Sequence, residues 1–210
     1  MSVVIADKDL PLAVDLAGAL RGRGIQTAIL ASPGQGSPSP MEIPWNRSSP
    51  LSARTVFVDA QNRNEPVGQL VLVFDTASLS GSLPHTDQSS EMRMVDDHVR
   101  SYLLLSQAAA ARFRERDGGR IVFVLRGGIQ AGSHVPAALA EGAFSRLAEE
   151  TAASFAASGN SGLQTLLVRM EAEDGAESLA WLVSQIENPS PSRGPSRWVK
   201  AGARGLFGRF

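Results

Sequence analysis

Two uninterrupted apolar runs constrain the fold of this chain most: LVLVF at residues 70–74 and IVFVL at residues 121–125. A strand that is exposed on one face alternates apolar and polar residues, whereas a strand covered on both faces does not. The second run continues through a glycine-containing loop into a long alanine-rich helix, over residues 119–156. The pattern therefore predicts a parallel sheet with helices on both of its faces.

Strand-like and helix-like segments alternate along the chain, which is typical of α/β proteins with right-handed crossovers. The predicted strands are residues 3–6, 26–30, 55–58, 69–74, 121–125 and 163–168. The predicted helices lie between Asp9 and Gly24 and over about residues 91–116, 136–158 and 174–187. Residues 32–52 are rich in Pro, Ser and Gly and are predicted as a long loop. We expect one doubly wound, Rossmann-like domain over residues 1–188, with a mostly parallel sheet.

The composition excludes several kinds of protein. Lys and Arg number 20 against 21 Asp and Glu, and the net charge of −1 gives no overall field that would attract nucleic acid. Cysteine is absent, which removes disulfides, thiolate chemistry and cysteine-bound zinc. The N-terminus lacks the pattern of a signal peptide, and no apolar run reaches the roughly 18 residues of a membrane-spanning helix. We therefore expect a cytoplasmic protein without nucleic-acid partners.

Four segments together resemble the short-chain dehydrogenase/reductase family: QLVLVFDTAS, VRSYLLLSQAAAARF, DGGRIVFVLRGG and LAEGAFSRLAEETAASFA. The resemblance is closest to the noncatalytic N-terminal domain of high-molecular-weight β-ketoacyl-ACP reductases, a degenerate Rossmann-like domain that precedes an active reductase domain. It implies a Rossmann-like fold and a place in fatty acid or polyketide metabolism.

The phosphate-binding turn of that family is altered in this chain. The family carries Thr-Gly-x-x-x-Gly-x-Gly after the first strand, where glycines let backbone amides approach the pyrophosphate. Here the turn reads ADKDLPLA, with no glycine before Gly18 and with carboxylates at Asp7 and Asp9. A carboxylate at about 4 Å from a phosphate charge costs on the order of 1–4 kcal/mol. We therefore expect no cofactor, with NADP bound only if its binding mode is atypical.

The family's catalytic positions are also altered, as far as the resemblance can place them. Its serine falls near Leu125, Arg126 or Gly127. Its tyrosine and lysine fall at Ala137 and Glu141, or at Leu139 and Ala143 in the alternative register. Carbonyl reduction needs an acid beside the hydride acceptor, and neither register supplies a hydroxyl or an amine. We therefore expect no catalytic residues.

The remaining candidates for chemistry are few. Tyr102, the chain's one tyrosine, belongs to the preceding helix, and His98 corresponds to the family's helix asparagine. The imidazole-centred candidates, Asp97, His85, His98 and His134, show no metal-ligand spacing, so no metal site is expected. Arg126, Gly127 and Gly128 follow a strand at the carboxyl edge of the sheet, where doubly wound folds bind ligands. This loop is a candidate anion or ligand site, and the alternative is a solvated loop.

Two predicted helices carry residues suited to close packing with another chain. In the family, the corresponding helices form the main subunit interface. The candidate interface residues are Leu103, Leu104, Ala108, Ala140, Phe144, Leu147 and Phe155. They predict a homodimer, or a heteromer with an active short-chain reductase. The alternative is that they only bury the core of this chain.

Residues 189–210 are predicted to be a Pro/Ser linker followed by an irregular basic and aromatic tail, and the family's last strand is expected to be missing. Arg193, Arg197, Lys200, Arg204 and Arg209 lie there without an opposing acid. Trp198, Val199, Leu206, Phe207 and Phe210 add apolar anchors. Such a tail suits an acidic carrier protein, an anionic membrane surface approached peripherally, or a partner's groove, and the alternative is a loose tail.

These observations together favour a noncatalytic protein related to short-chain dehydrogenases. We expect it to act as an assembly or regulatory subunit, with an active β-ketoacyl reductase-type partner. Two alternatives remain: a divergent NAD(P)-dependent oxidoreductase of the same family, and a ligand-binding scaffold.

Overall fold

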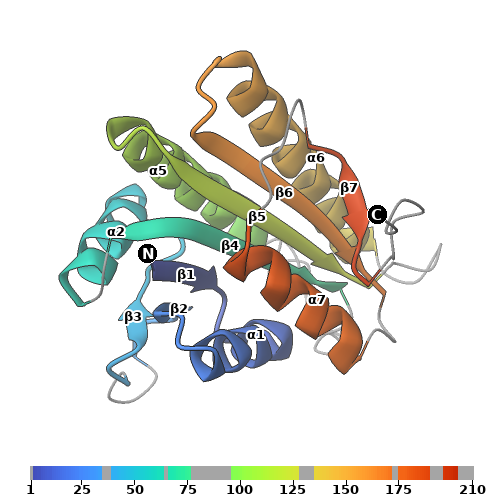
Figure 1. Ribbon diagram of the computed structural model, residues 1–210, viewed down its shortest axis with the longest axis horizontal. Coiled ribbons are helices and arrows are strands. Elements are labelled where there is room, and N and C mark those ends of the chain that lie inside the picture. The colour runs from blue at the N-terminus through green and yellow to red at the C-terminus, as the bar shows by residue number, and fades with distance from the viewer. Residues whose placement is uncertain are drawn as a thin grey trace.

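The computed structural model describes residues 2–34, 39–63, 66–76, 96–127, 135–171, 175–189 and 196–202, with only the backbone of residue 97. Within these residues the chain forms a seven-stranded sheet in the order β3-β2-β1-β4-β5-β6-β7 (Figure 1). The strands are β1 (Ser2–Ala6), β2 (Thr27–Ala31), β3 (Glu42–Pro44), β4 (Val67–Asp75), β5 (Gly119–Arg126), β6 (Leu163–Met170) and β7 (Trp198–Lys200).

All neighbouring strands pair in parallel, and the strand order reverses between β1 and β4. The first half of the chain builds outward from β1 to β3, and the second half builds in the opposite direction from β4 to β7. This arrangement confirms the predicted doubly wound, Rossmann-like fold. In such folds the crevice at the reversal is where ligands bind.

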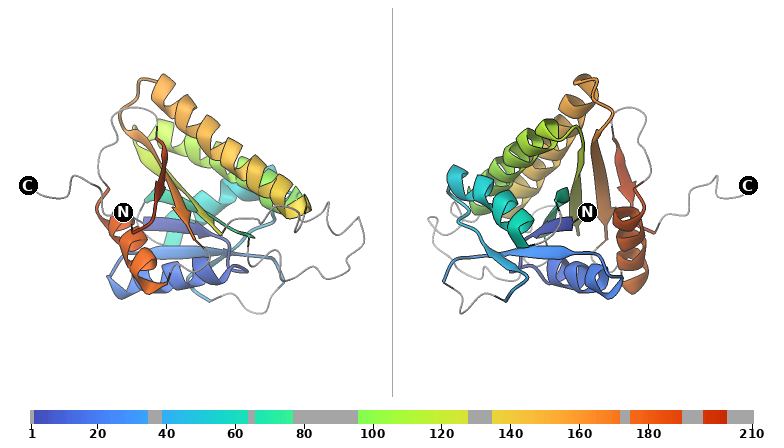
Figure 2. Two further views of the ribbon diagram at one scale, coloured as in Figure 1. Left: turned by 90° about the vertical axis from the view of Figure 1, so that its right-hand side faces the viewer. Right: turned by 60° about the vertical axis from the view of Figure 1, so that its left-hand side comes forward.

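Helices cover both faces of the sheet, as Figures 1 and 2 show. On one face lie α1 (Pro11–Gly22) and α7 (Ala176–Glu187). On the other lie α2 (Pro50–Arg63), α5 (Ser101–Glu115) and α6 (Val135–Ala157). A short π-helical turn, η1 (Asp96–Arg100), leads into α5.

Alternate residues of each strand point to the two faces, which gives the sheet a core on each side. In β4, Leu70, Leu72 and Phe74 pack toward α2, α5 and α6, while Val71 and Val73 pack toward α1 and α7. Both faces of the central strands are therefore buried, which explains why these strands read as continuous apolar runs.

The sequence prediction was wrong for one strand. Residues 55–58, expected as a strand, lie inside α2. Ala53, Val56, Phe57 and Ala60 are buried at helical spacing, and this helical period outweighs the preference of the β-branched residues for strands. The predicted loop over residues 32–52 also contains β3 and the start of α2.

The family's last strand, expected to be missing, is present as β7. Val199 pairs with Val168 of β6, and the Trp198 Nε1–H donates a hydrogen bond of 3.0 Å to Glu149 Oε1 on α6. The Arg169 guanidinium lies 5.2 Å from the centre of the Trp198 ring. Part of the predicted tail is thus held against the sheet, because its apolar residues complete the edge of the fold. Residues 203–210 lie outside the described residues, so the tail's external contacts stay a prediction.

In the part of the chain that the structure describes, no helix is both long enough and apolar enough to cross a membrane.

Substitutions at Phe144 test the packing of α6 on the sheet. Its ring lies 5.2 Å from Phe74 and 5.8 Å from each of Tyr102 and Phe123, measured between ring centres, and it is fully buried. We expect Phe144→Ala to lower the free energy of unfolding by about 3–5 kcal/mol in chemical denaturation, because it leaves a cavity among these rings. Phe144→Leu keeps most of the apolar volume and should lose clearly less. Equal losses in the two variants would contradict this packing.

Candidate ligand crevice at the β1–β4 reversal

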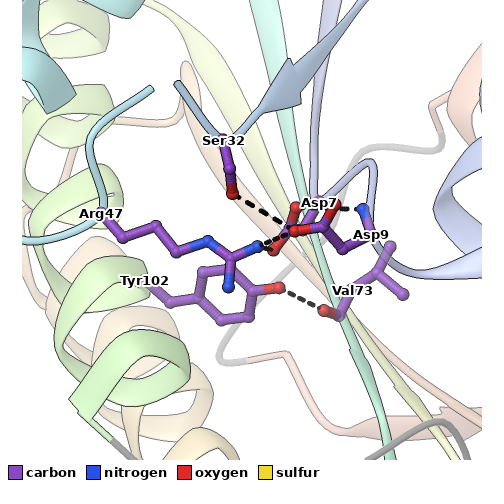
Figure 3. A network of polar contacts seen from close by, with 6 residues as sticks. All are labelled: Asp7, Asp9, Ser32, Arg47, Val73 and Tyr102. Atoms are coloured by element: carbon purple, nitrogen blue, oxygen red, sulfur yellow. Dashed lines mark hydrogen bonds and ion pairs between the residues drawn. The ribbon is translucent and has the colours of Figure 1, made fainter. Parts of the chain in front are cut away.

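The carboxyl ends of β1, β4 and β5 bring charged residues to the crevice where the strand order reverses. Asp7 directly follows β1, and Asp75 and Arg126 are the last residues of β4 and β5. Arg47 reaches the same place from the segment between β3 and α2, as Figure 3 shows. The crevice therefore collects side chains from segments far apart in the sequence.

Arg47 connects two carboxylates. It forms an ion pair with Asp7, and its Nη2 lies 2.7 Å from Asp9 Oδ2 (Figure 3). The Ser32 hydroxyl, just after β2, donates to Asp9 Oδ2 at 3.3 Å. Burial raises the pKa of Asp7 above its ordinary value, although the Arg47 charge and a hydrogen bond from the Asp9 amide oppose the shift. The desolvation of this carboxylate thus outweighs its pairing.

The turn between β1 and α1 uses its own amides. The Lys8 N–H donates to the Leu30 carbonyl at 2.9 Å, and the Leu10 N–H donates to the Asp7 carbonyl at 3.1 Å. The Asp9 N–H donates to Asp7 Oδ1 at 3.2 Å, and Pro11 at the start of α1 has no N–H. A pyrophosphate held by this turn would need these donors. The turn therefore does not fit the family's usual way of binding a dinucleotide.

Tyr102 of α5 lies beside Arg47 (Figure 3). Its hydroxyl donates a hydrogen bond of 2.6 Å to the Val73 carbonyl of β4 (Figure 3). Complete burial, together with the nearby Asp7 charge, holds the pKa of Tyr102 well above its ordinary value. The side chain is thus a neutral phenol committed to the backbone. Sequence position alone missed that this tyrosine lies beside Arg47 and Asp7 (Figure 3).

Two hydrogen-bond donors in the crevice have no partner within the described residues: Trp45 Nε1 and Arg47 Nε, both buried. The Trp45 ring stacks on Tyr102 with 6.4 Å between ring centres, and the Arg47 guanidinium lies 5.9 Å from the centre of the Trp45 ring. Both residues belong to the segment predicted as a loop. Its sequence signal is the short apolar stretch around Ile43 within a run of Pro and Ser, which could have indicated β3.

The predicted anion loop lies at the same edge. Arg126 Nη1 is 3.6 Å from Asp75 Oδ2, and the Gly127 N–H donates to the Met170 carbonyl at 2.8 Å. Gly128 lies outside the described residues. The role of this loop stays a prediction, and Arg126 already has a carboxylate partner.

The positions assigned to catalysis by resemblance lie on or near α6. Ala137 is buried, Leu139 is exposed, and Glu141 and Ala143 are partly buried. His98, on η1, is buried with its ring edge toward Phe74 and Tyr102. His85, His134 and the side chain of Asp97 lie outside the described residues. Among the residues that are described, no group of three His, Cys, Asp or Glu side chains is placed to hold a metal ion.

The predicted interface residues separate into two sets. Ala140, Phe144 and Phe155 are buried in the core between α6 and the sheet, so they are not available to a second chain. The reason is geometric, because these positions form the stripe of α6 that covers the sheet. Leu103 is 40% exposed. Leu104, Ala108 and Leu147 are partly exposed, and for these four residues the interface stays a prediction.

No protein-family profile matches this chain. A protein of Treponema pallidum is 32% identical over 213 residues, covering 99% of this chain and 95% of that protein, and it is itself uncharacterized. The chain belongs to the family of this treponemal protein. Its sequence relatives therefore supply no activity.

Solved structures show the fold more widely. An oxidoreductase assigned to the short-chain dehydrogenase/reductase family from Aeromonas hydrophila is similar, with a TM-score of 0.71 and 16% identity over 95% of this chain and 97% of that one. A family member from Brucella ovis, in complex with a partially ordered NAD, has a TM-score of 0.66 and 12% identity over 95% of this chain and 98% of that one. A short-chain dehydrogenase from Burkholderia cenocepacia, in complex with NADP, has a TM-score of 0.65 and 14% identity. The match covers 96% of this chain and 88% of that one. The fold is that of short-chain dehydrogenases.

These neighbours correct the expectation that the protein has no cofactor. The Brucella and Burkholderia proteins were crystallised with NAD and NADP, so the fold points to nucleotide binding rather than to none. The expectation was wrong because it judged cofactor binding from the family's usual phosphate-binding turn alone. The unpartnered donors of Trp45 and Arg47 are side-chain groups that fit an anionic ligand beside that turn.

The raised pKa of Asp7 predicts a pH-dependent stability. With the folded pKa above the ordinary value of 3.8, the protonated form contributes stability below that pH, and this contribution is lost as pH rises through the folded pKa. Asp7→Asn keeps the shape and the acceptor oxygen but never ionises. We therefore expect its melting temperature to exceed that of the wild type at neutral pH, with the difference shrinking in acid.

Thermal unfolding of both proteins over a pH series measures this difference. Asp15→Asn, at an exposed position of α1, is the matched control and should follow the wild type throughout. An Asp7→Asn variant that is less stable than the wild type at neutral pH would show that ion pairing outweighs desolvation.

Proposed function

We propose that this protein is a nucleotide-binding, short-chain-dehydrogenase-like subunit that carries out no hydride transfer. The observation that carries the proposal is the pair of buried, unpartnered donors, Trp45 Nε1 and Arg47 Nε, at the β1–β4 reversal. Doubly wound folds bind nucleotides at this reversal. An indole N–H beside a guanidinium suits the oxygens of a phosphate.

The ligand's anionic part would be held by side chains. Arg47 supplies charge and hydrogen bonds, and Trp45 supplies its indole N–H. Lys8, whose Nζ lies 2.8 Å from Glu42 Oε1, adds a second cation at the rim. Asp7 and Asp9 hold the Arg47 guanidinium in position, and their charges oppose a ligand with several negative charges.

A nicotinamide dinucleotide supplies a hydride when it is bound, but the residues that the structure describes offer no matching acid. Tyr102, the one tyrosine, is held by the Val73 carbonyl, and burial keeps its pKa high. At the aligned positions on α6 stand Ala137 and Glu141, or Leu139 and Ala143. These features favour a bound nucleotide that serves as a structural or regulatory ligand.

The assembly role rests on separate features. Leu103 is exposed on α5, and the resemblance to the noncatalytic domain of β-ketoacyl reductases supplies the expected partner, an active reductase of acyl-chain metabolism or a second copy of this chain. The basic tail adds a candidate contact for an acidic carrier protein.

Calorimetric titrations of the protein with NADPH, NADH and ATP test the proposed nucleotide binding. We expect saturable binding of at least one nucleotide, weakened about tenfold or more by Arg47→Met, because a hydrogen bond to a charged group contributes about 1.5–3 kcal/mol. Arg146→Met removes an exposed arginine of α6 and should bind like the wild type.

Arg47→Met leaves the buried Asp7 carboxylate without its cation, so the double variant Asp7→Asn/Arg47→Met separates lost binding from lost folding. A folded double variant with unchanged affinity, or a wild type that binds none of the three nucleotides, would refute the proposal. Oxidation of NADPH in the presence of a β-ketoacyl thioester would refute the noncatalytic part.

Sedimentation velocity, alone and with a co-purified reductase, tests the assembly. We expect a complex at micromolar concentration that Leu103→Glu dissociates, because it places a charge in an apolar contact. Leu51→Glu, at a 70% exposed leucine of α2, is the matched control and should leave the complex intact. Only monomers under both conditions would contradict the role.

A further inference from the structure

A row of polar residues crosses the sheet at its amino edge, far along the strands from the crevice. Gln69 of β4 pairs in register with Arg120 of β5, and Arg120 pairs in register with Gln164 of β6. Register partners in a parallel sheet point to the same face. Such a row is unexpected between strands that are otherwise apolar, so each polar group requires a partner.

Two side chains of the row hold the end of α7. Gln69 Nε2 donates to the Ile186 carbonyl and Arg120 Nη1 to the Gln185 carbonyl, each at 2.7 Å. These are among the last carbonyls of the helix, which attract donors and positive charge. A structural role therefore accounts for one side of each side chain.

The other side of each side chain is unused. Gln69 is 1% exposed and Arg120 is 6% exposed. Gln69 Oε1 and Arg120 Nε are both buried without a hydrogen-bond partner among the described residues. No carboxylate of the described chain lies within ion-pair distance of Arg120, and burial lowers the pKa of its guanidinium. A buried cation without a counter-ion is costly.

A cavity of about 160 Å³ lies beside Gln69 and Arg120, which are among its lining residues. The other lining residues are Gln164, Pro189 and three glycines at the amino ends of the strands, Gly68, Gly119 and Gly162. A single water needs only about 10–15 Å³ of such space. The cavity therefore has room for a molecule of several heavy atoms, and its lining consists of one arginine, two glutamines, one proline and three glycines.

The free groups specify the ligand's chemistry. With Nη1 committed to α7, the guanidinium retains its Nε and Nη2 edge, which is the edge that pairs with the two oxygens of a carboxylate. Gln69 Oε1 accepts a hydrogen bond, so the ligand requires a donor close to its carboxylate. We propose that this cavity binds a small carboxylate with a neighbouring hydroxyl or amino group, independently of the crevice.

The test uses glycolate, the smallest hydroxycarboxylate, and acetate, which lacks the hydroxyl. Nitrogen-15 spectra of the arginine Nε–H groups report directly on Arg120, whose signal is assigned from its absence in Arg120→Lys. We expect a saturable shift of this signal with millimolar glycolate and at least tenfold weaker binding of acetate, because acetate leaves Gln69 Oε1 unpartnered.

A variant that leaves the α7 contacts intact provides the decisive comparison. Gln164→Glu places a carboxylate beside Arg120, at a partly exposed position. It should abolish the glycolate shift without lowering the melting temperature. Gln107→Glu makes the same charge change at an exposed position of α5 and should bind like the wild type.

Three results would overturn the proposal. One is the absence of a saturable shift in the wild-type protein. Another is an equal shift with sodium chloride at matched ionic strength. The third is glycolate binding that persists in Gln164→Glu. Any of these would show that the cavity does not bind a small hydroxycarboxylate and holds only water.

Discussion

The carboxylate of Asp7, buried at the end of β1, is the constraint on which the crevice depends. A buried charge of this kind needs a partner, and Arg47 meets that need from a segment 40 residues further along the chain. The ion pair draws the segment after β3 across the mouth of the sheet. Trp45 is then placed over Tyr102, and the Arg47 guanidinium lies 5.9 Å from the centre of the Trp45 ring. Without the Asp7 carboxylate, the ion pair that draws Arg47 to the end of β1 would be lost.

The same carboxylate also explains why the glycine turn is absent. The Asp7 carboxylate accepts from the Asp9 amide, and the Asp7 backbone carbonyl accepts from the Leu10 amide. The Lys8 amide donates to the Leu30 carbonyl of β2, so the turn is satisfied within the protein. A turn that bound pyrophosphate would leave those amides free. The two arrangements exclude each other at this turn, although they do not exclude a nucleotide at its side. The lost motif and the retained crevice are therefore consistent with each other.

The sheet could be predicted from sequence because its cause is local and repeated. Apolar runs such as 70–74 and 121–125 follow from burial on both faces, and each one indicates a central strand. The helix α2 was missed because Val56 and Phe57 favour strands, and its buried positions are recognised only when the spacing from Ala53 to Ala60 is considered. The strand β7 was missed because its three residues gain their stability from pairing with β6, which a local pattern does not contain. The crevice could not be predicted, since Arg47 and Asp7 meet only through the strand order.

Each edge of the sheet buries charged side chains, but the charges are compensated differently at the two edges. At the carboxyl edge the buried charges are paired, by Arg47 with Asp7 and by Arg126 with Asp75, so a ligand there must compete with existing ion pairs. At the amino edge the buried Arg120 has helix carbonyls but no carboxylate within the described chain, so a ligand there would supply the missing charge. Affinity at the first site is accordingly limited by the cost of separating Arg47 from its partners. At the second site it is limited mainly by entry to the cavity, because the guanidinium edge and the amide oxygen are already fixed by α7.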